Sequence, residues 1–137
     1  WGSVSAVAAA ADFSFARSTA TSNIPQVGHN FMPPMGWSAV CDRMRRNALL
    51  WRAYSQDVID AERALSYGLV SQVVDADKLD AEVDRFCERM INNPQPAVLG
   101  LKEYLRSAPR MDDQGALDYA RSIHSMVNTA AAMKKDH

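Results

Sequence analysis

Polar side chains that could act on a substrate gather in the stretch NIPQVGHNFMPPMG, Asn23 to Gly36. Gln26, His29 and Asn30 stand close together there, and the surrounding prolines and glycines predict a loop. The amide of Gln26 can orient a water or a substrate oxygen, but it cannot take up a proton at neutral pH. His29 could act as a general base. It has no Ser, Cys or Asp partner at a telling spacing, so a structural or solvent-exposed histidine is the alternative.

Carboxylates are nearly absent from this part of the chain. Between Trp1 and Cys41 the only carboxylate is that of Asp12. Paired carboxylates that divide the work of general acid and general base are therefore not available within this segment.

The run GSVSA, which begins at Gly2, is a second candidate. It could open a helix whose first amide groups point outward. Together with the helix dipole, such amides suit an anion or a developing oxyanion. The alternative is that these small residues allow close packing of the helix against a neighbouring backbone.

Basic residues form a third group. Four arginines are interleaved with Trp37 and Trp51 and could pair with phosphates or RNA, namely Arg43, Arg45, Arg46 and Arg52. The net charge of −1 favours a solvated helical face or a subunit interface instead. Lys134 and Lys135 could hold a phosphate or form a polar tail.

Composition excludes several classes of function. The chain has 137 residues, of which 47% are hydrophobic and 23% charged, which is typical of one globular domain. With a net charge of −1, no nucleic-acid or membrane partner is predicted. The histidines do not compose a metal site, so none is predicted. Cys41 and Cys87 lie in apolar helical patterns, and we expect buried free thiols in a reducing compartment.

The elements that must position these groups follow from periodicity and from turn residues. Strands are expected at DFSFA, with Phe13 and Phe15 on a buried edge, and at VSQVV. Helices are expected over residues 2–11, from residue 37 with a break near Asn47, at DAERALSYGLV, at DADKLDAEVDRFCERMI, at AVLGLKEYL and after Asp112 or Asp113. Asp60 should begin one of them and Gly68 should end it. One apolar helical face comprises residues 40, 44, 48 and 51, and one helical stripe comprises Leu79, Val83, Phe86 and Met90. The residues expected to face inward are Val98, Leu101 and Leu105, and then Leu117, Ala120, Ile123 and Val127.

One long segment, VIDAERALSYGLVSQVVDADKLDAEVDRFCERMINNPQPAVLGLKEYL, resembles the crotonase (enoyl-CoA hydratase/isomerase) superfamily and its pattern ISAxEAxxxGLVxxVV. The matching residues are Ile59, Ala61, Ala64, Gly68, Leu69, Val70 and Val74, followed by Pro96 and Lys102. Upstream, AADFSFARSTATSNIPQVGHNFMPPMG resembles the family's CDxxxAxxxAxFxxPEVxxGxxPxxG. The resemblance covers nearly the whole chain.

This resemblance implies an α/β protein, α+β in this segment, with a crotonase-like (ClpP/crotonase) fold. Residues 1–56 would be the C-terminal part of the spiral core with the oxyanion and active-site loops. Residues 57–137 would be a helical C-terminal region for oligomerisation. Family chains are longer, so this chain is expected to be the C-terminal half, entered just before the glycine-rich oxyanion segment.

The resemblance also implies a site. Two backbone amides polarise a thioester carbonyl in this family, and one of them would come from Gly2 or Ser3. Family hydratases use two glutamates, and alignment on Asp12 places the first at Ala6 and the second at Gln26. A shift of two residues in the glycine segment would place the first at Val4. Neither alignment yields a carboxylate, so standard two-glutamate hydration is not expected.

By resemblance, the function is then an acyl-CoA-processing enzyme that works through a stabilised thioester enolate, as an isomerase, decarboxylase, C–C hydrolase or lyase. His29, Asn30 or a residue of the other half would replace the glutamates. The alternative is a catalytically silent crotonase-like subunit that binds CoA or a protein partner. Coenzyme A would enter as part of the substrate, with no covalently bound cofactor, and Lys134 and Lys135 could contact it. We expect a homotrimer or a dimer of trimers, in the cytoplasm or an organellar matrix.

Overall fold

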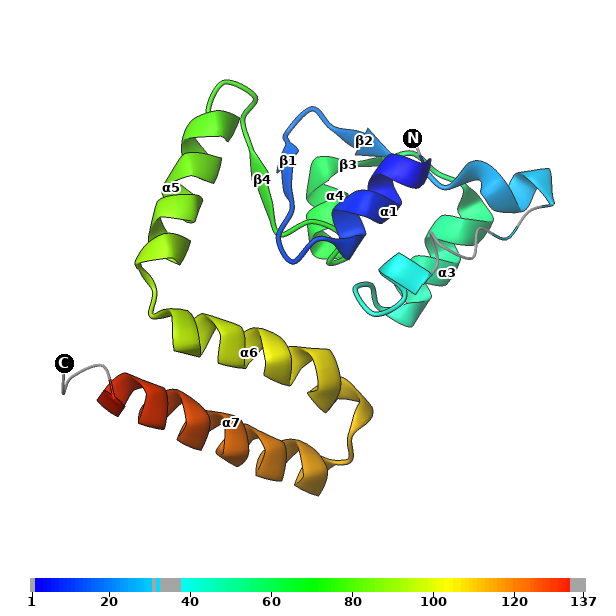
Figure 1. The fold of residues 1–137 in the computed structure, drawn as a ribbon. Helices are drawn as coiled ribbons and strands as arrows, with labels where there is room; N and C mark the ends of the chain where they lie inside the picture. Colours follow the sequence, from blue (N-terminus) through cyan, green and yellow to red (C-terminus); the bar gives the residue numbers. More distant parts are fainter. Residues whose placement is uncertain (1, 31, 33–37, 134–137) are drawn as a thin grey trace. The chain divides into compact units, whose positions relative to one another are not determined.

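The computed structural model describes residues 2–30, 32 and 38–133, and it describes only the backbone of residues 2–5, 26 and 131–133. The chain forms two compact units, which we call unit 1 (residues 1–84) and unit 2 (residues 85–137). Figure 1 shows the elements of both units. The boundary falls inside a helix and concerns packing alone. The functional division into residues 1–56 and 57–137 therefore stays a prediction.

Unit 1 is built from short elements around two small sheets. In chain order these are α1 (Gly2–Ala10), β1 (Phe15–Arg17), β2 (Thr21–Ser22), the 3₁₀ helix η1 (Pro25–His29), α3 (Arg46–Ser55), β3 (Ile59–Asp60), α4 (Ala61–Ser66), β4 (Gln72–Val74) and the start of α5 (Leu79–Asn92). Strand β1 runs parallel to β4, and β2 runs antiparallel to β3. The two strands expected at DFSFA and VSQVV are confirmed. Phe13, however, precedes the ladder and is 52% exposed, so the expected buried edge at Phe13 is wrong.

One cluster of buried apolar side chains holds unit 1 together. Its members come from four helical segments, one strand and two turns, and they are Ala9, Val40, Met44, Ala48, Ile59, Ala64 and Leu69. Three of them are alanines, and small side chains let helix backbones approach closely. The small-residue helix expected from Gly2 is therefore confirmed as α1, and it is anchored to the core by Ala9.

The helical run expected from residue 37 is interrupted earlier than Asn47. Turns occupy the region of residues 41–45, and α3 begins at Arg46. The interruption changes which side of the second helix faces the core. Arg52, one turn after the buried Ala48, is fully buried, whereas Trp51 is 57% exposed. The expected apolar face of residues 40, 44, 48 and 51 is therefore wrong at Trp51.

Helix α4 has well-defined ends. The Asp60 Oδ1 accepts a hydrogen bond from the Arg63 amide at 2.8 Å, which confirms the expected N-cap. After the helix, Gly68 has φ +80°, and the Leu69 amide donates to the Ala64 carbonyl at 2.9 Å. This is a Schellman motif, which the left-handed glycine makes possible. A Cβ at Gly68 would lie 2.6 Å from the Arg43 carbonyl oxygen, so the close approach also requires glycine.

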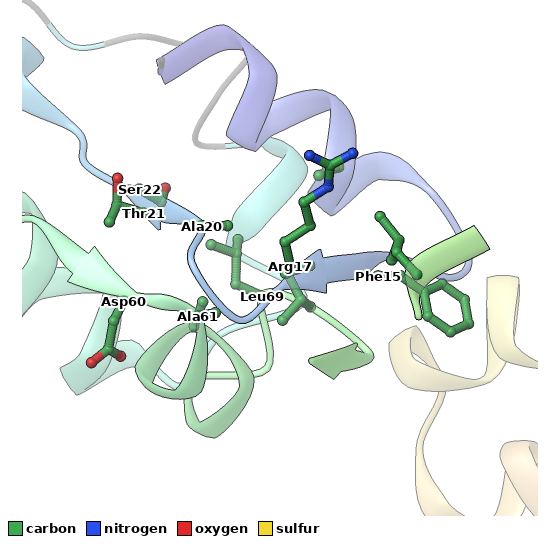
Figure 2. Close-up of a pocket in the computed structure, with 13 residues that line it drawn as sticks. Phe15, Arg17, Ala20, Thr21, Ser22, Asp60, Ala61 and Leu69 are labelled. Carbon is green, nitrogen blue, oxygen red and sulfur yellow. The ribbon is translucent and has the colours of Figure 1, made fainter. Parts of the chain in front are cut away.

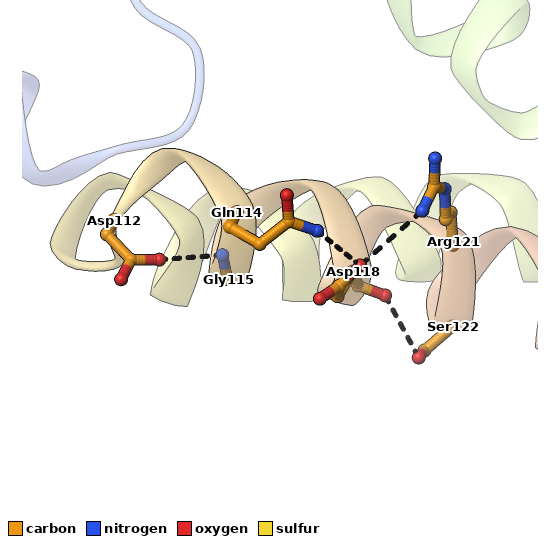
Figure 3. Close-up of polar contacts among 6 residues, drawn as sticks. All are labelled: Asp112, Gln114, Gly115, Asp118, Arg121 and Ser122. Carbon is orange, nitrogen blue, oxygen red and sulfur yellow. Dashed lines mark hydrogen bonds and ion pairs between the residues drawn. The ribbon is translucent and has the colours of Figure 1, made fainter.

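Unit 2 is mainly a pair of helices, α6 (Gln95–Ser107) and α7 (Asp113–Met133), joined by the 3₁₀ helix η2 (Ala108–Arg110). The α6 and α7 ribbons lie side by side (Figure 1). At the start of α7, Oδ1 of Asp112 accepts from the Gly115 amide at 2.7 Å, which confirms the expected cap (Figure 3). Further along, Gln114 and Arg121 both reach the carboxylate of Asp118.

The inward faces expected in unit 2 are only partly right. Ile123 is buried, and Val98, Ala120 and Val127 are half-buried. Leu101, Leu105 and Leu117 are instead 60%, 58% and 46% exposed, so their expected burial is wrong. Two helices can cover only a narrow stripe of each other, which leaves the rest of each apolar face open.

Both cysteines are free, as expected, but both are exposed. Cys41 lies in the turn that interrupts the helical run, and Cys87 lies in α5, next in sequence to the half-buried Phe86. The expected burial of these thiols is therefore wrong. Among the described helices, none has both the length and the apolar character needed to span a membrane.

Candidate functional site

The candidate oxyanion donors lie at the start of α1. The helix begins at Gly2, so the backbone amides of Gly2 and Ser3 belong to its first turn, where amides have no partner within the helix. The first turn carries no acidic residue, so the positive end of the helix dipole is not neutralised there. Ala9, 1% exposed, fixes the helix to the core. The backbone arrangement suits the predicted role of these amides, and that role stays a prediction.

Ala6 lies on the same helix, one turn before Ala9, and is half-buried. A methyl group at this position can take no part in proton transfer. The other position of a family glutamate, Gln26, lies in η1, and its backbone alone is described. Neither residue carries a carboxylate, and their correspondence to the family glutamates stays a prediction.

The three polar candidates of the first loop fall on one short segment. Gln26 and His29 belong to η1, and Asn30 ends it with a left-handed φ of 54°. The Asn30 amide donates to the Val27 carbonyl at 3.1 Å, and Ile24, just before η1, is buried. This segment is therefore ordered by its own turn and by one apolar anchor. The side chains of His29 and Asn30 are exposed, so solvent can reach both.

Helix α3 contacts η1, and two polar residues that sequence reasoning did not single out for this role lie nearby: Arg52 in α3 and Gln56, which follows α3. Nη2 of Arg52 donates to Oγ of Ser22, at the end of β2. Burial lowers the pKa of Arg52 from its usual value, and the charge of Tyr67 acts in the opposite direction. At the other end, the side chain of Gln56 lies so close to Gly28 that a Cβ there would collide with its Oε1.

A pocket of about 350 Å³ opens beside β1 and β2 (Figure 2). Its lining is mostly apolar, with polar groups from Arg17, Thr21, Ser22 and Asp60. The described lining does not include Ala6, His29 or Asn30. Asp60, whose Oδ1 already accepts from the Arg63 amide, is its sole carboxylate among the described lining residues. The pocket therefore offers apolar binding space without a second carboxylate for acid–base work.

The remaining polar candidates do not assemble into a site within the described part of the chain. Arg43, Arg45 and Arg46 are exposed, as the solvated-face alternative expects. His124 on α7 shares a hydrogen bond of 2.9 Å with Asn128. Lys134, Lys135 and His137 lie outside the described residues, and Trp37 does as well. Among residues 2–30, 32 and 38–133, no three His, Cys, Asp or Glu side chains gather as metal ligands would.

Comparison with known proteins gives one similar curated sequence and many similar structures. No protein-family model matches the chain. The chain is 30% identical over 115 residues to the crotonyl-CoA hydratase of Syntrophomonas wolfei, a match that covers 83% of this chain and 43% of that protein. The chain thus spans less than half the length of this curated relative.

Two solved structures illustrate the structural match. The enoyl-CoA hydratase of Mycobacterium smegmatis superposes with a TM-score of 0.84 at 19% identity, over 90% of this chain and 48% of its own. A Thermobifida fusca protein solved in complex with acetoacetyl-CoA superposes with a TM-score of 0.82 at 23% identity, over 90% and 49%. At these identities the structures establish the fold, which confirms the expected crotonase-like architecture.

Proposed function

The chain has the fold of the enoyl-CoA hydratase/isomerase (crotonase) superfamily and resembles it in sequence, and from this premise we propose that the whole protein processes an acyl-CoA thioester through a stabilised enolate. The observation that carries the proposal is the position of the Gly2 and Ser3 amides in the first turn of a helix that Ala9 anchors to the core. The binding of acetoacetyl-CoA by a protein of the same fold supports the ligand class.

The proposed mechanism begins with the thioester carbonyl oxygen. An amide of Gly2 or Ser3, together with a second donor from the rest of the protein, hydrogen-bonds this oxygen. The two donors stabilise negative charge that builds up as the α-carbon becomes enolate-like. Preorganised donors of this kind contribute about 3–4 kcal/mol each to transition-state stabilisation.

The proposed reaction differs from two-glutamate hydration. With a methyl group at Ala6 and an amide at Gln26, neither family position can donate or take a proton at neutral pH. Gln26 is left to orient a water or a substrate oxygen. His29 or Asn30, or a residue elsewhere in the protein, would serve any proton transfer, and isomerisation, decarboxylation, C–C hydrolysis and lyase chemistry fit this arrangement.

Three further features belong to the same proposal. Lys134 and Lys135 would contact the CoA moiety. The protein would associate as a homotrimer or a dimer of trimers, which the exposed apolar side chains of unit 2 support. Its compartment would be the cytoplasm or an organellar matrix.

The oxyanion role is tested by replacing Ser3 with proline in the full-length protein. Proline removes the backbone N–H but is tolerated in the first turn of a helix, and Ser3→Ala keeps the N–H as a matched control. Acetoacetyl-CoA reports the interaction because its enolate has its own ultraviolet band. We expect Ser3→Pro to weaken enolate binding by about ten- to a hundredfold and Ser3→Ala to leave it nearly unchanged. Equal behaviour of the two variants would remove Ser3 as a donor; Gly2→Pro then tests the neighbouring amide.

The missing carboxylates are tested by restoring them. Gln26→Glu alone supplies one carboxylate without its partner and should not produce efficient hydration of crotonyl-CoA. The double variant Ala6→Glu with Gln26→Glu should produce hydration above the background of the unmodified protein, as followed by loss of the enoyl absorbance. Robust hydration by the unmodified protein would contradict the proposed division of roles.

A silent crotonase-like subunit remains the second candidate, and the same two positions favour it. A site without carboxylates at Ala6 and Gln26 could bind CoA or a protein partner and catalyse nothing. In that case acyl-CoA would bind without turnover, or neither the unmodified protein nor the double variant would bind acyl-CoA at all.

A further inference from the structure

Arg52 is a charged residue at a buried position of α3, where an apolar residue would be expected. It has no exposed surface, and its neighbours on α3, Ala48 and Ala53, are buried as well. Among the described residues, Nε and Nη1 of Arg52 find no acceptor, and its one described hydrogen bond goes to Ser22. Burying a charged group with few partners is unfavourable, and apolar replacements of similar volume are often neutral or stabilising. The stability of the core therefore does not explain Arg52.

The hydrogen bond of Arg52 leads directly to the candidate site segment. Its acceptor, Ser22, is the last residue of β2, and Ile24 and η1 follow immediately. The bond joins residues 30 positions apart in the sequence. It therefore fixes the start of the segment to α3 rather than to a sequence neighbour.

Gln56 makes a second attachment at the other end of the segment. It follows α3 with a left-handed φ of 56°, a conformation that costs energy for residues other than glycine. Its side-chain amide lies against Gly28, within η1, so close that a Cβ at Gly28 would displace the amide. Gln56 thus adopts an unfavourable backbone conformation at a place where its side chain meets the loop.

We propose that Arg52 and Gln56 are positioning residues, which hold the segment from Ser22 to Asn30 in a fixed place on α3. Arg52 holds the entry to the segment and Gln56 holds its 3₁₀ turn. The consequence for catalysis, that the amide of Gln26 is kept in register with the substrate, rests on the proposed function. The attachment of the segment to α3 does not, so the two can be tested separately.

Replacement of Gln56 by glycine separates positioning from stability. Glycine suits the left-handed backbone at this position, so Gln56→Gly should leave the melting temperature of the full-length protein unchanged or raise it. The same change removes the side chain that meets Gly28. We expect faster hydrogen exchange at the Asn30 amide, which bonds the Val27 carbonyl, by about tenfold or more.

Replacement of Arg52 tests the other attachment. Arg52→Met keeps much of the side-chain volume and removes the hydrogen bond to Ser22, and Arg52→Lys keeps a charged donor. Arg46→Met, on the exposed start of the same helix, is the matched control. We expect faster exchange over residues 26–30 for Arg52→Met, partial recovery for Arg52→Lys and no change for Arg46→Met.

Hydrogen exchange over residues 26–30 tests the positioning role of Arg52 and Gln56. Steady-state kinetics tests whether that role matters for catalysis. If Gln56→Gly and Arg52→Met both leave exchange over residues 26–30 unchanged, the positioning role is overturned. If they accelerate it, the role is supported. In an active protein the same variants should lower kcat by about ten- to a hundredfold with a smaller change in KM, because a misplaced group mainly affects the reacting geometry. Accelerated exchange in a protein that neither binds nor converts acyl-CoA would support the positioning role and overturn the proposed function instead.

Discussion

The internal packing of unit 1 differs from that of unit 2. Unit 1 buries residues from several short segments around one cluster, including Ala9, Met44 and Leu69. In the described part of unit 2, the buried side chains are Ala108 and Ile123, and large leucines on both helices are exposed. Unit 1 therefore depends on contacts between distant parts of the chain, whereas unit 2 depends on helix ends and on one helix–helix contact. The difference teaches that one apolar pattern can build a core or leave an open surface, depending on what is available to cover it.

The largest effect should follow from Gly68→Ala in unit 1. A side chain at φ +80° costs about 1–2 kcal/mol, and the clash with the Arg43 carbonyl adds to it. We expect the free energy of unfolding to fall by about 3 kcal/mol or more in a denaturant titration. Ser66→Ala, at the exposed end of the same helix, should change it by less than about 0.5 kcal/mol. Similar losses for both would show that the turn can relax.

Leucine truncation compares the two units directly. Leu69 is 4% exposed and belongs to the core cluster, so Leu69→Ala should cost about 2–4 kcal/mol. Leu101 in unit 2 is 60% exposed, so Leu101→Ala should cost well below about 1 kcal/mol in highly diluted protein. The contrast would fail if both changes lowered the midpoint of unfolding equally at high dilution. A loss at Leu101 that grows with protein concentration would show that this face is covered by association.

Smaller effects than those of Gly68→Ala and Leu69→Ala should come from the helix caps, a feature that both units have. Asp60→Ala and Asp112→Ala each remove a carboxylate that accepts from a backbone amide, at 2.8 Å and 2.7 Å. Each should lower stability by about 1 kcal/mol. Asn replacements keep an acceptor and serve as controls, since Asn caps nearly as well as Asp. A loss from Asp112→Ala that is much larger than that from Asp60→Ala would indicate that unit 2 depends on its caps even more than we infer.

Features set by local chemistry were predictable from the sequence. The caps at Asp60 and Asp112 and the left-handed Gly68 depend on residues within one turn, and all three expectations are confirmed. The error at Trp51 arose where the helix was interrupted at residues 41–45, because the interruption changed the face of α3 that meets the core. The error at Leu101 arose because periodicity identifies an apolar face but not the surface that covers it.

The loop with Gln26, His29 and Asn30 was singled out from local sequence, whereas the glutamate positions come from the family resemblance alone. That resemblance assigns them to Ala6 and Gln26, and the assignment stays a prediction. The contact between Arg52 and Ser22 joins segments that are distant in the sequence, and the contact of Gln56 with Gly28 depends on a left-handed backbone. Neither composition nor periodicity carries information about such pairs. Tertiary contacts of this kind become visible only in the folded chain.

The parallel pairing of β1 with β4 has a consequence for the order of folding. The Ser71 amide bonds the Ser14 carbonyl, and Ser71 Oγ accepts from the Ser14 amide, so this ladder closes a loop of 57 positions. The bonds that define α4 and its Schellman turn lie instead within the segment from Asp60 to Leu69. Closing a long loop costs chain entropy before the stabilising contacts between its ends can form. A local turn has a much smaller entropy cost and therefore forms faster. We therefore expect α4 and its turn to form first and the β1–β4 ladder to form late, so that damage to the ladder mainly accelerates unfolding.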